Sequence, residues 1–360
     1  MIVGFGEIMA RITAPGFRRW RQALPGSVEV SWGGAEANVC AALAYWGHPV
    51  RFITALPDQA VADALVASLQ SLAIDTRWIV RREGRLGLYF VEMGANQRGS
   101  TVLYDRQGSA VSLAEPPEYR WPEALAGARW VHLSGITPAL SQSAFQAALA
   151  CARQAKSQGA HLSVDMNFRK KLWRWHAEIA PRDLARQSMP ELLALADLIV
   201  GNEEDAEDVL GIHTEGTNVH TGQLDVEAYG QTARQIARRF PQVRWVAITL
   251  RQSYSADYNG WGALLFDSTR EELCCAPCDA NGSYTPYLIR DIVDRIGAGD
   301  AFAAGLIHGL VSWPDDVQRA LAFATAAGCL KHSIAGDFAY VSVPEIESLV
   351  SGQSGGRVQR

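Results

Sequence analysis

Short apolar segments typical of buried strands alternate along most of this chain with longer segments typical of helices. The expected strands are Ile2–Gly6, Val50–Thr54, Trp130–Leu133, Leu162–Asp165, Leu198–Val200 and Trp245–Leu250. The expected helices between them are Ala35–Trp46, Gln59–Leu72, Gln142–Ser157 and Val226–Arg239. Parallel strands need long crossovers, which are usually helices, so this order predicts a three-layer α/β/α fold with a mostly parallel central sheet.

Polar residues follow several of the expected strands. In open α/β sheets, ligands bind outside the carboxyl ends of the strands. The residues expected at those ends include Glu7, Asn167, Asn202, Arg251 and Asp300. The sequence therefore predicts one site at this edge of the sheet.

Composition and charge narrow the class of protein. The chain has 360 residues, 48% of them hydrophobic, which is enough for a large core in a single α/β domain. Its net charge is −5, with both signs interspersed and no Lys/Arg-rich block, so we expect no nucleic-acid partner. We find no apolar run that could span a bilayer and no signal-peptide pattern at the N-terminus. We therefore expect a cytoplasmic enzyme that does not bind membranes.

Two segments interrupt the alternation of strands and helices. Residues 10–33 are rich in Arg, Trp, Pro and Gly, and residues 86–106 read as two short strands around a polar turn. Together they predict a small β-sheet lid over the strand ends. We expect one domain over residues 1–346 with these segments inserted, followed by a disordered tail over residues 347–360.

Cys275-Ala276-Pro277-Cys278 is a C-x-x-C motif, a spacing found in metal and redox sites. No second cysteine pair or histidine cluster completes a zinc set. The sequence therefore assigns no role to these two cysteines or to the neighbouring Cys274.

The segment Gly297-Ala298-Gly299-Asp300 stands between a strand-like run and a helix expected over Ala301–Leu310. Glycines at a helix start let a ligand approach the backbone, and the unpaired N–H groups there favour an anion. A carboxylate beside an anion site suits a base that takes a proton from an attacking alcohol. Asp300 as an ordinary N-cap explains the tetrapeptide equally well, and the four residues alone leave both interpretations open.

Other strand-end segments carry similar double interpretations. Gly33-Gly34-Ala35-Glu36-Ala37-Asn38 is either a ligand-binding helix start or a turn before a packing helix. Arg169, in Asp165-Met166-Asn167-Phe168-Arg169, is suited to a carboxylate but also fits a solvated basic turn. The acidic run Asn202-Glu203-Glu204-Asp205 can hold hydrated Mg²⁺ or simply cap a helix. Arg251 ends a core strand and can reach nucleotide phosphates.

In combination, these segments resemble the PfkB/ribokinase family of sugar kinases over roughly residues 2–346. The two glycine-rich segments carry the resemblance, Gly33 to Asn38 near the start and Asp294 to Asp300 near the end. The 2-keto-3-deoxygluconate kinase branch is the most similar one. Its lid and terminal motifs match Leu88-Tyr89-Phe90-Val91-Glu92, Val102-Leu103-Tyr104-Asp105-Arg106 and Lys331-His332-Ser333-Ile334-Ala335-Gly336-Asp337-Phe338.

The resemblance implies a ribokinase-like fold and a set of site residues. At the sugar acid it implies Gly34, Asn38, Tyr89, Tyr104, Arg106, Ile136, Arg169 and Asp300. At ATP it implies Asn202, Thr249, Arg251, Gly297, Gly299 and His332. The catalytic group would be Asp300 as base, with Gly297, Ala298 and Gly299 forming the anion site. Asp205 would hold Mg²⁺, mostly through water.

Three departures from the family pattern bear on the nucleotide site. The acidic Asn-x-x-Glu element ends here in Asp205, and the usual Thr-x-Gly turn reads Thr249-Leu250-Arg251. Arg295-Ile296 replaces the common Thr-containing pair. The phosphate and Mg²⁺ contacts should therefore differ from those of many family members.

The expected activity is transfer of the γ-phosphoryl group of ATP to a primary hydroxyl of 2-keto-3-deoxygluconate. A PfkB-type kinase for another substrate, such as fructose or a different keto-sugar acid, is the nearest alternative. A non-catalytic sugar-binding protein on the same fold is an alternative of another class. A Rossmann dehydrogenase is weaker, because Gly4-Phe5-Gly6 lacks the third glycine of the dinucleotide fingerprint. Since lids of this family often pair between subunits, we also expect a homodimer or higher homo-oligomer.

Overall fold

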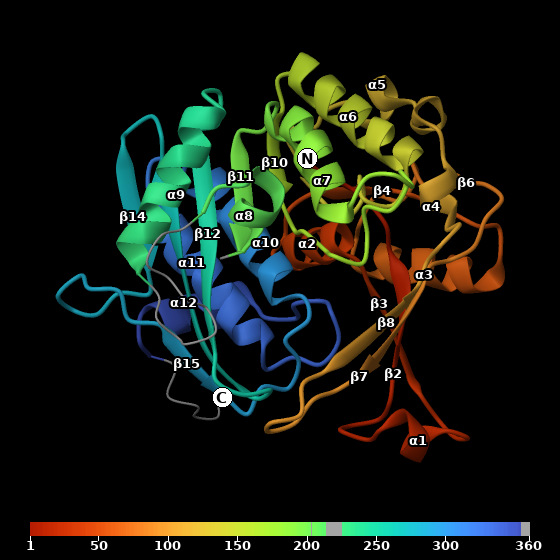
Figure 1. The fold of residues 1–360 in the computed structure, drawn as a ribbon, viewed down its shortest axis with the longest axis horizontal. Coiled ribbons are helices and arrows are strands. Elements are labelled where there is room, and N and C mark those ends of the chain that lie inside the picture. The colour runs from red at the N-terminus through yellow and green to blue at the C-terminus, as the bar shows by residue number, and fades with distance from the viewer. Residues whose placement is uncertain (203, 214–224, 354–360) are drawn as a thin grey trace.

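The chain folds around one mixed sheet, shown in Figure 1. The structure is a computed structural model that describes residues 1–202, 204–213 and 225–353. The strand order is β14-β13-β12-β11-β10-β9-β1-β4, with β15 paired to β13. The bounds are β1 (Ile2–Phe5), β4 (Val50–Ile53), β9 (Trp130–Ser134), β10 (His161–Asp165), β11 (Leu198–Asn202), β12 (Trp245–Ser253), β13 (Tyr258–Asp267), β14 (Glu272–Ala276) and β15 (Tyr287–Arg290). Neighbours from β4 to β12 pair in parallel, so their carboxyl ends meet at one edge.

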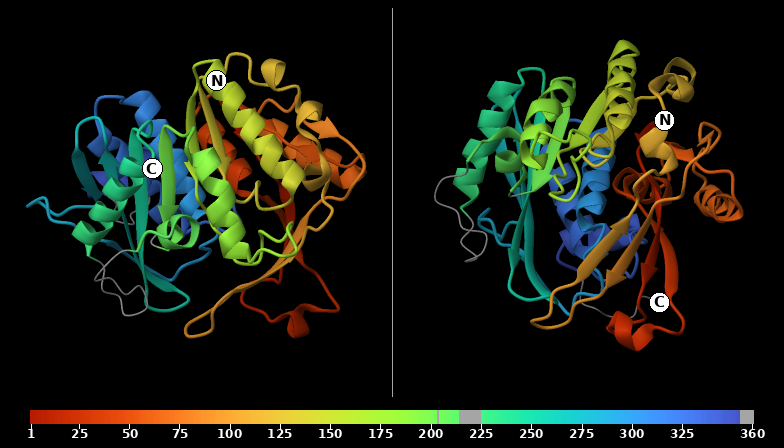
Figure 2. Two further views of the ribbon diagram at one scale, coloured as in Figure 1. Left: turned by 45° about the horizontal axis from the view of Figure 1, so that its top comes forward. Right: turned by 45° about the vertical axis from the view of Figure 1, so that its right-hand side comes forward.

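Helices cover both faces of this sheet (Figures 1 and 2). One layer holds α4 (Ala110–Leu113), α5 (Trp121–Ala124), α6 (Gln142–Ser157), α7 (Pro181–Leu193), α8 (Asp205–Leu210) and α9 (Val226–Arg239). The other holds α2 (Ala35–Tyr45), α3 (Ala60–Ser71), α10 (Ala298–Ser312), α11 (Val317–Lys331) and α12 (Val343–Val350). The shorter elements are β5 (Ala55–Leu56), β6 (Val80–Arg81) and η1 (Pro116–Tyr119).

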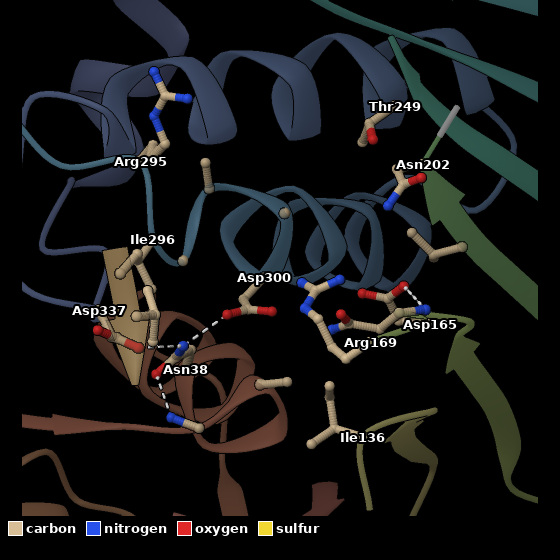
Figure 3. A pocket seen from close by; sticks show the side chains of 18 of the residues that line it. Asn38, Ile136, Asp165, Arg169, Asn202, Thr249, Arg295, Ile296, Asp300 and Asp337 are labelled. Carbon is tan, nitrogen blue, oxygen red and sulfur yellow. Dashed lines mark hydrogen bonds between the residues drawn. The ribbon is translucent and has the colours of Figure 1, made fainter. Parts of the chain in front are cut away.

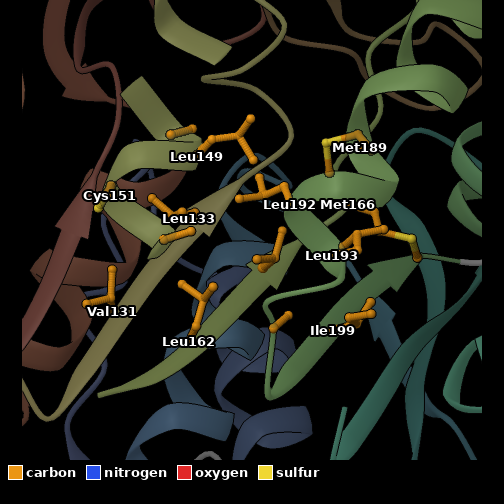
Figure 4. Close-up of a cluster of buried hydrophobic side chains, with 14 of the residues drawn as sticks. Val131, Leu133, Leu149, Cys151, Leu162, Met166, Met189, Leu192, Leu193 and Ile199 are labelled. Carbon is orange, nitrogen blue, oxygen red and sulfur yellow. The ribbon is translucent and has the colours of Figure 1, made fainter. Parts of the chain in front are cut away.

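Each face of the sheet has its own hydrophobic core. Figure 4 shows part of one core, where Val131, Leu133 and Leu162 from the strands meet Leu192 and Leu193 of α7. Strands buried on both faces carry near-continuous apolar runs, which explains why the parallel strands could be recognised in the sequence. Within the described residues, none of the helices is both long enough and apolar enough to cross a membrane.

Close packing of α10 against α11 fixes the direction in which α10 points. A Cβ atom on Gly305 would lie 2.5 Å from the Cα of Ala324, and one on Gly309 would lie 2.5 Å from the Cα of Ala320. Both glycines therefore let the two helix backbones approach more closely than a side chain would permit. The N-terminus of α10 is thereby held at the edge of the sheet where the parallel strands end.

A separate small sheet projects from the main body at this edge (Figures 1 and 2). Its strand order is β3-β2-β7-β8, formed by β2 (Met9–Thr13), β3 (Glu29–Gly33), β7 (Leu88–Glu92) and β8 (Thr101–Asp105), with α1 (Trp20–Ala23) between β2 and β3. Tyr89 is directly opposite Tyr104 in the antiparallel β7–β8 pair, so both side chains lie on the same face. The small sheet expected from the two interrupting segments is therefore present.

The predictions made from sequence differ from the fold in three places. The prediction of a disordered tail over residues 347–360 was wrong at its start, because residues 347–350 belong to α12. Residues 354–360 lie outside the described part of the chain. Helix α10 begins at Ala298, three residues before its expected start. The antiparallel extension β13–β14 was not anticipated, because its sequence shows no helix between strands and so departs from the repeating pattern.

Candidate active site

The candidate active site is one cavity of about 360 Å³ between the small sheet and the carboxyl ends of the parallel strands. A volume of this size is typical of small-molecule sites. Every site residue expected from the sequence lines this cavity, although the segments are far apart in the chain. These are Gly34, Asn38, Tyr89, Tyr104, Arg106, Ile136, Arg169, Asn202, Asp205, Thr249, Arg251, Gly297, Ala298, Gly299, Asp300 and His332.

The N-terminus of α10 opens into the cavity. Gly297 is the N-cap residue with φ 87°, and a Cβ there would lie 2.2 Å from the main-chain oxygen of Asp337. Only glycine suits that conformation and that contact. At Gly299, by contrast, a Cβ would meet no atom within 4 Å. The first N–H groups of α10 have no intrahelical acceptor, so they and the helix dipole favour an anion in this open space.

Asp300 is the third residue of α10 and does not cap it. Its Oδ2 atom accepts a hydrogen bond of 2.6 Å from the Nδ2 atom of Asn38, and no side chain caps the helix at Gly297. Burial, followed by the negative charge of Asp337, raises the pKa of Asp300 to about 6. The hydrogen bond from Asn38 opposes that shift. The carboxylate is therefore held by a side chain and titrates close to neutral pH, as a base would.

The turn before α2 fixes the Asn38 amide. Asn38 is buried, and its Oδ1 atom accepts a hydrogen bond of 3.2 Å from the Gly34 N–H. A Cβ on Gly34 would lie 2.0 Å from the main-chain oxygen of Glu7, so glycine is needed for this turn to pack against the end of β1. Because Oδ1 is an acceptor here, Nδ2 must be the atom that faces Asp300.

Aromatic and basic side chains line the end of the cavity next to the small sheet. Tyr89 and Tyr104 stack with ring centroids 5.9 Å apart, and the Arg106 guanidinium lies 5.5 Å from the Tyr104 ring centroid. Arg106 forms a buried ion pair with Glu7, in which its Nε atom donates to Glu7 over 2.6 Å. Its charge is therefore already neutralised by a carboxylate within the protein.

Arg169 lies on the side of Asp300 that is opposite to Asn38 (Figure 3). Its Nη1 atom donates to the main-chain oxygen of Phe168 over 2.9 Å, and it takes part in none of the ion pairs recorded for the described residues. Burial, followed by the charges of Asp205 and Asp300, raises the pKa of Asp165 well above its usual value, and Arg169 opposes this. This guanidinium is thus an accessible positive charge beside Asp300.

Two arginines, Arg251 and Arg295, lie together in another part of the cavity. Burial and the neighbouring charge of Arg251 lower the pKa of Arg295. Arg295 also donates to the main-chain oxygens of Ser255 and Ala256, at 3.2 and 2.5 Å. The charges of Asp257 and Asp294 oppose this shift in pKa. Two arginines that line one part of the cavity favour a multiply charged anion there.

His332 is neutral in this environment. Burial lowers its pKa to about 4, and its Nδ1 atom lies 2.8 Å from the main-chain oxygen of Gly328. This contact requires a proton on Nδ1, so Nε2 is left as an acceptor. Trp261 packs edge-on against the His332 ring and also lines the cavity.

Asn202 and Asp205 have structural partners as well as a place in the cavity. The Asn202 Oδ1 atom accepts from the N–H groups of Glu204 and Asp205, at 2.8 and 3.1 Å. The two carboxylate oxygens of Asp205 accept from the N–H groups of Phe168 and Asn202, each at 2.9 Å. Asn202 thus accepts from the first N–H of α8, whereas neither Glu204 nor Asp205 caps this helix with its side chain; Glu203 lies outside the described residues.

Several cavity residues were not chosen from the sequence, including Asp337, Asp165, Arg295, Trp261 and Met9. Asp337 and Asp165 belong to segments quoted for the family resemblance, so their position in those motifs was an available signal. Arg295 was noted only as a departure from the usual pair. Met9 and Trp261 are apolar residues within ordinary strands, and nothing local distinguishes them from core residues.

Comparison with known proteins agrees with this geometry. The model of the pfkB family of carbohydrate kinases matches residues 1–253 and 261–337. The chain belongs to this family. It is therefore a carbohydrate kinase, as its Gly-Ala-Gly-Asp turn and its glycine-rich start to α2 indicated.

Individual relatives cover nearly the whole chain. The crystal structure of 2-dehydro-3-deoxygluconokinase from Thermotoga maritima has a TM-score of 0.86 and 39% identity, over 98% of this chain and 99% of that one. The 2-dehydro-3-deoxygalactonokinase of Haloferax volcanii is 28% identical, over 99% of this chain and 98% of its own length. Fructokinase-1 of Oryza sativa is 26% identical over 92% of this chain and 91% of its own.

The raised pKa of Asp300 predicts that this carboxylate lowers the stability of the fold. The carboxyl is easier to ionise in the unfolded chain than in the fold, so its stabilising contribution is complete below pH 3.8 and is lost as the pH rises to about 6. That shift corresponds to roughly 3 kcal/mol. Asp300→Asn should therefore raise the free energy of unfolding by about 1–3 kcal/mol above pH 6 and by almost nothing below pH 4.

Urea unfolding between pH 4 and 8 measures this difference. Asp58→Asn, which removes an exposed carboxylate from the surface, is the matched control and should show no such pH-dependent gain. A destabilised Asp300→Asn protein at pH 7 would contradict the electrostatic description of the site.

Proposed function

We propose that the chain transfers the γ-phosphoryl group of ATP to a primary hydroxyl of a keto-sugar acid. The preferred substrate in this proposal is 2-keto-3-deoxygluconate, phosphorylated on O6. The observation that carries it is the placement of an accessible guanidinium, Arg169, next to the Asp300 carboxylate in one cavity. The names of the Thermotoga maritima and Haloferax volcanii relatives, which act on 2-dehydro-3-deoxy sugar acids, support the same substrate class.

Arg169 is a better anchor for the substrate carboxylate than Arg106. A neutral ketose has no need of a guanidinium, whereas a sugar acid gains a charge-assisted and two-pronged contact from one. Arg106 is already paired with Glu7 in a buried contact, so a second carboxylate there would share its charge. Arg106 would instead position Tyr104, over whose ring it lies, while Arg169 binds the acid group.

The remaining lining residues would hold the sugar hydroxyls. Gly34 keeps its part of the cavity wall free of a side chain, Asn38 would accept through the second lone pair of its Oδ1 atom, and Tyr89 and Tyr104 offer ring faces and hydroxyl groups. The N–H of Ile136 donates to the Ser134 hydroxyl over 3.2 Å, and its carbonyl accepts from the Ala139 N–H over 3.1 Å, so only the second lone pair of that carbonyl would be left for a sugar hydroxyl.

Asp300 would orient the attacking hydroxyl and accept its proton. As the bond from the sugar oxygen to the γ-phosphorus forms, the bond to the leaving oxygen of ADP breaks, and the hydroxyl proton passes to the Asp300 carboxylate. The N–H groups of Gly299 and Asp300 and the dipole of α10 would stabilise the negative charge on the transferring group. In this scheme Asn38 keeps the carboxylate aimed at the hydroxyl.

The part of the cavity around Arg251 and Arg295 fits the ATP phosphates. Arg251 and Arg295 supply two neighbouring positive charges there. Thr249 lines the cavity beside Asn202 (Figure 3), and the neutral His332 and Trp261 offer an acceptor and an aromatic surface to the rest of the nucleotide.

The carboxylates fit a magnesium ion that is bound mainly through water. Among the described residues there is no group of three His, Cys, Asp or Glu side chains that could hold a metal ion directly. Asp165 would hold the water shell better than Asp205, because both Asp205 oxygens accept backbone N–H groups, whereas Asp165 accepts one, from Asn167. When bound, Mg²⁺ neutralises charge on the phosphate oxygens. A cation there would also relieve the repulsion that raises the pKa of Asp165.

The outer face of the small sheet suits contact with a second copy of the chain. Val30, Ile12, Phe90 and Leu103 are cross-strand neighbours that form one apolar row over four strands, on the face opposite Tyr89 and Tyr104. Val30 is 60% exposed and Leu103 is 64% exposed. Ile12 and Phe90, between them, are partly buried, and Trp20 packs edge-on against the Phe90 ring. An apolar row that is exposed at both ends marks an association surface, so we propose a homodimer formed through the small sheet. The expected cytoplasmic location stays a prediction.

ADP release over a panel of acceptors tests the proposed activity. The panel includes 2-keto-3-deoxygluconate, 2-keto-3-deoxygalactonate, fructose and ribose, each measured with saturating ATP and Mg²⁺. We expect the highest kcat/KM with one of the two keto-sugar acids. Preference for fructose would favour the fructokinase alternative, to which the Oryza sativa relative points.

Removal of the Arg169 guanidinium should weaken binding of the acid specifically. A lost charge-assisted contact of about 1.5–3 kcal/mol predicts that Arg169→Leu raises KM for the sugar acid by roughly 10–100-fold. KM for ATP should change little. The control is Lys170→Leu, which removes the adjacent exposed positive charge outside the cavity. An unchanged KM for the acid in Arg169→Leu would rule out Arg169 as the anchor.

Disruption of the apolar row should separate the two proposed subunits. The chain mass is 39.2 kDa, and light scattering of the purified protein should give twice that value. Leu103→Asp combined with Val30→Asp should give the monomer mass. Leu288→Asp changes an equally exposed leucine on β15 and should leave the dimer intact. A wild-type protein of monomer mass at micromolar concentration would refute this interface.

A further inference from the structure

Asp337 is a buried carboxylate in the cavity that the proposed phosphoryl transfer does not use. It lies in the turn that follows α11 and is 4% exposed. Its Oδ1 atom accepts from the Nη1 atom of Arg11 over 2.8 Å, and its Oδ2 atom accepts from the Nδ2 atom of Asn38 over 3.3 Å. Figure 3 shows the resulting line of side chains from Asp337 through Asn38 to Asp300.

Arg11 extends this line to the small sheet. Arg11 lies on β2 and is only 2% exposed, and its Nη2 atom forms a second ion pair with Asp294 at 2.6 Å. Asp294 in turn accepts from the N–H groups of Ile296 and Gly336, at 3.0 and 3.1 Å. One guanidinium therefore joins the small sheet to the turn before α10 and to the turn that carries Asp337.

The small sheet is built to admit this contact. A Cβ on Gly33, the last residue of β3, would lie 2.2 Å from Asp337 Oδ2 and 2.3 Å from the Tyr89 hydroxyl oxygen. A side chain at this position would push the carboxylate away. The Tyr89 hydroxyl thus lies beside Asp337, at the sugar end of the cavity.

We propose that Asp337 is a positioning residue for Asp300, acting through the Asn38 amide, and that Arg11 keeps the small sheet in register with it. The proposal rests on the proposed function, in which Asp300 is the base. Asn38 Nδ2 has two N–H groups, and each has one carboxylate to bind. Loss of the Asp337 acceptor would free the amide to turn away from Asp300.

Five charged residues from different parts of the chain interact with Asp300, and they set the sign of the expected pH effect. Asp337 raises the pKa of Asp300 after the larger contribution of burial, whereas Arg169 and Lys331 lower it. Asp165 at the end of β10 and Glu36 on α2 are acidic neighbours, and the charge of Asp300 contributes to the raised pKa of each. Removal of the Asp337 charge should therefore make Asp300 easier to ionise.

The pH dependence of kcat/KM separates this role from a merely structural one. In the wild-type protein, activity should fall as the pH drops through about 6, because protonated Asp300 cannot act as a base. In Asp337→Asn the acid limb should move to lower pH by roughly one unit, the scale expected for loss of a nearby like charge. The single oxygen of the new amide should stay with the charged Arg11, which leaves its NH2 group facing Asn38 Nδ2 with no acceptor there. kcat above pH 7 should therefore fall by about tenfold.

Asp294→Asn is the matched control. It removes the other carboxylate bound to Arg11, at similar burial, but Asp294 has no contact with Asn38. A merely structural network would change both variants alike, whereas the proposal expects the acid limb to move only in Asp337→Asn. Asp337→Glu keeps the charge with the ion pair to Arg11, so its acid limb should stay at the wild-type pH while kcat falls.

The full-length Asp300→Asn protein, measured in the same assay, separates failure of this inference from failure of the proposed function. Normal turnover in Asp300→Asn would overturn the proposed base itself. Loss of turnover there, with wild-type pH profiles and kcat in Asp337→Asn and Asp337→Glu, would overturn the role of Asp337 alone. If Asp337→Asn does not fold, the Asp337→Glu result decides, because an unchanged kcat would contradict positioning.

Discussion

The hydrogen bond between Asn38 and Asp300 is the contact on which the site depends. It joins two residues that are 262 positions apart and therefore brings the start of α2 to the start of α10. The backbone must satisfy several conditions for this bond to form: Gly34 packs against the end of β1, Gly297 adopts a positive φ, and the glycines of α10 admit α11. Gly34, Gly297, Gly305 and Gly309 are thus explained by close approaches that bring the two helix starts to one 2.6 Å contact, whereas Gly299 faces open space in the cavity.

Charge is divided along the cavity in a way that suits phosphoryl transfer. Asp165, Asp205 and Asp300 gather at the strand ends, where burial, followed by neighbouring negative charges, raises the pKa of each. Arg251 and Arg295 gather in another part of the cavity. In the free protein, burial and neighbouring negative charges disfavour the ionised form of Asp165, and burial and the charge of Arg251 lower the pKa of Arg295, although Asp257 and Asp294 oppose this. Both arrangements of charge become favourable when a cation and a polyphosphate are bound, so stability is exchanged for binding and catalysis.

Much of the fold and the site could be predicted from sequence, for physical reasons. Strands buried on both faces have continuous apolar runs, and crossover helices follow, so the alternating α/β pattern was readable. The glycine-rich turns at Gly33 and Gly297 signal close backbone approach, and these two carried the family resemblance. The residues around Asp300 in the sequence could not decide between a helix cap and a base, because only the fold brings Asn38 next to Asp300.

The missed features depend on long-range contacts. Arg11 reads as an isolated basic residue in a strand, and nothing in its neighbourhood announces two buried carboxylates from the other end of the chain. Arg106 was expected to bind the substrate acid, but Glu7, far away in sequence, already neutralises it. The antiparallel strands β13 and β14 break the repeating pattern, and α12 shortens the expected tail.

The most direct test of the account is the turnover of Asp300→Asn with ATP and the preferred sugar acid. The asparagine has the same shape and can still accept the Asn38 hydrogen bond, but it cannot take a proton. We expect kcat to fall by about 10²–10⁴, with a folded protein and little change in ATP binding. A variant that retains near-normal kcat would contradict the assignment of Asp300 as the base and, with it, the mechanism built on its contact with Asn38.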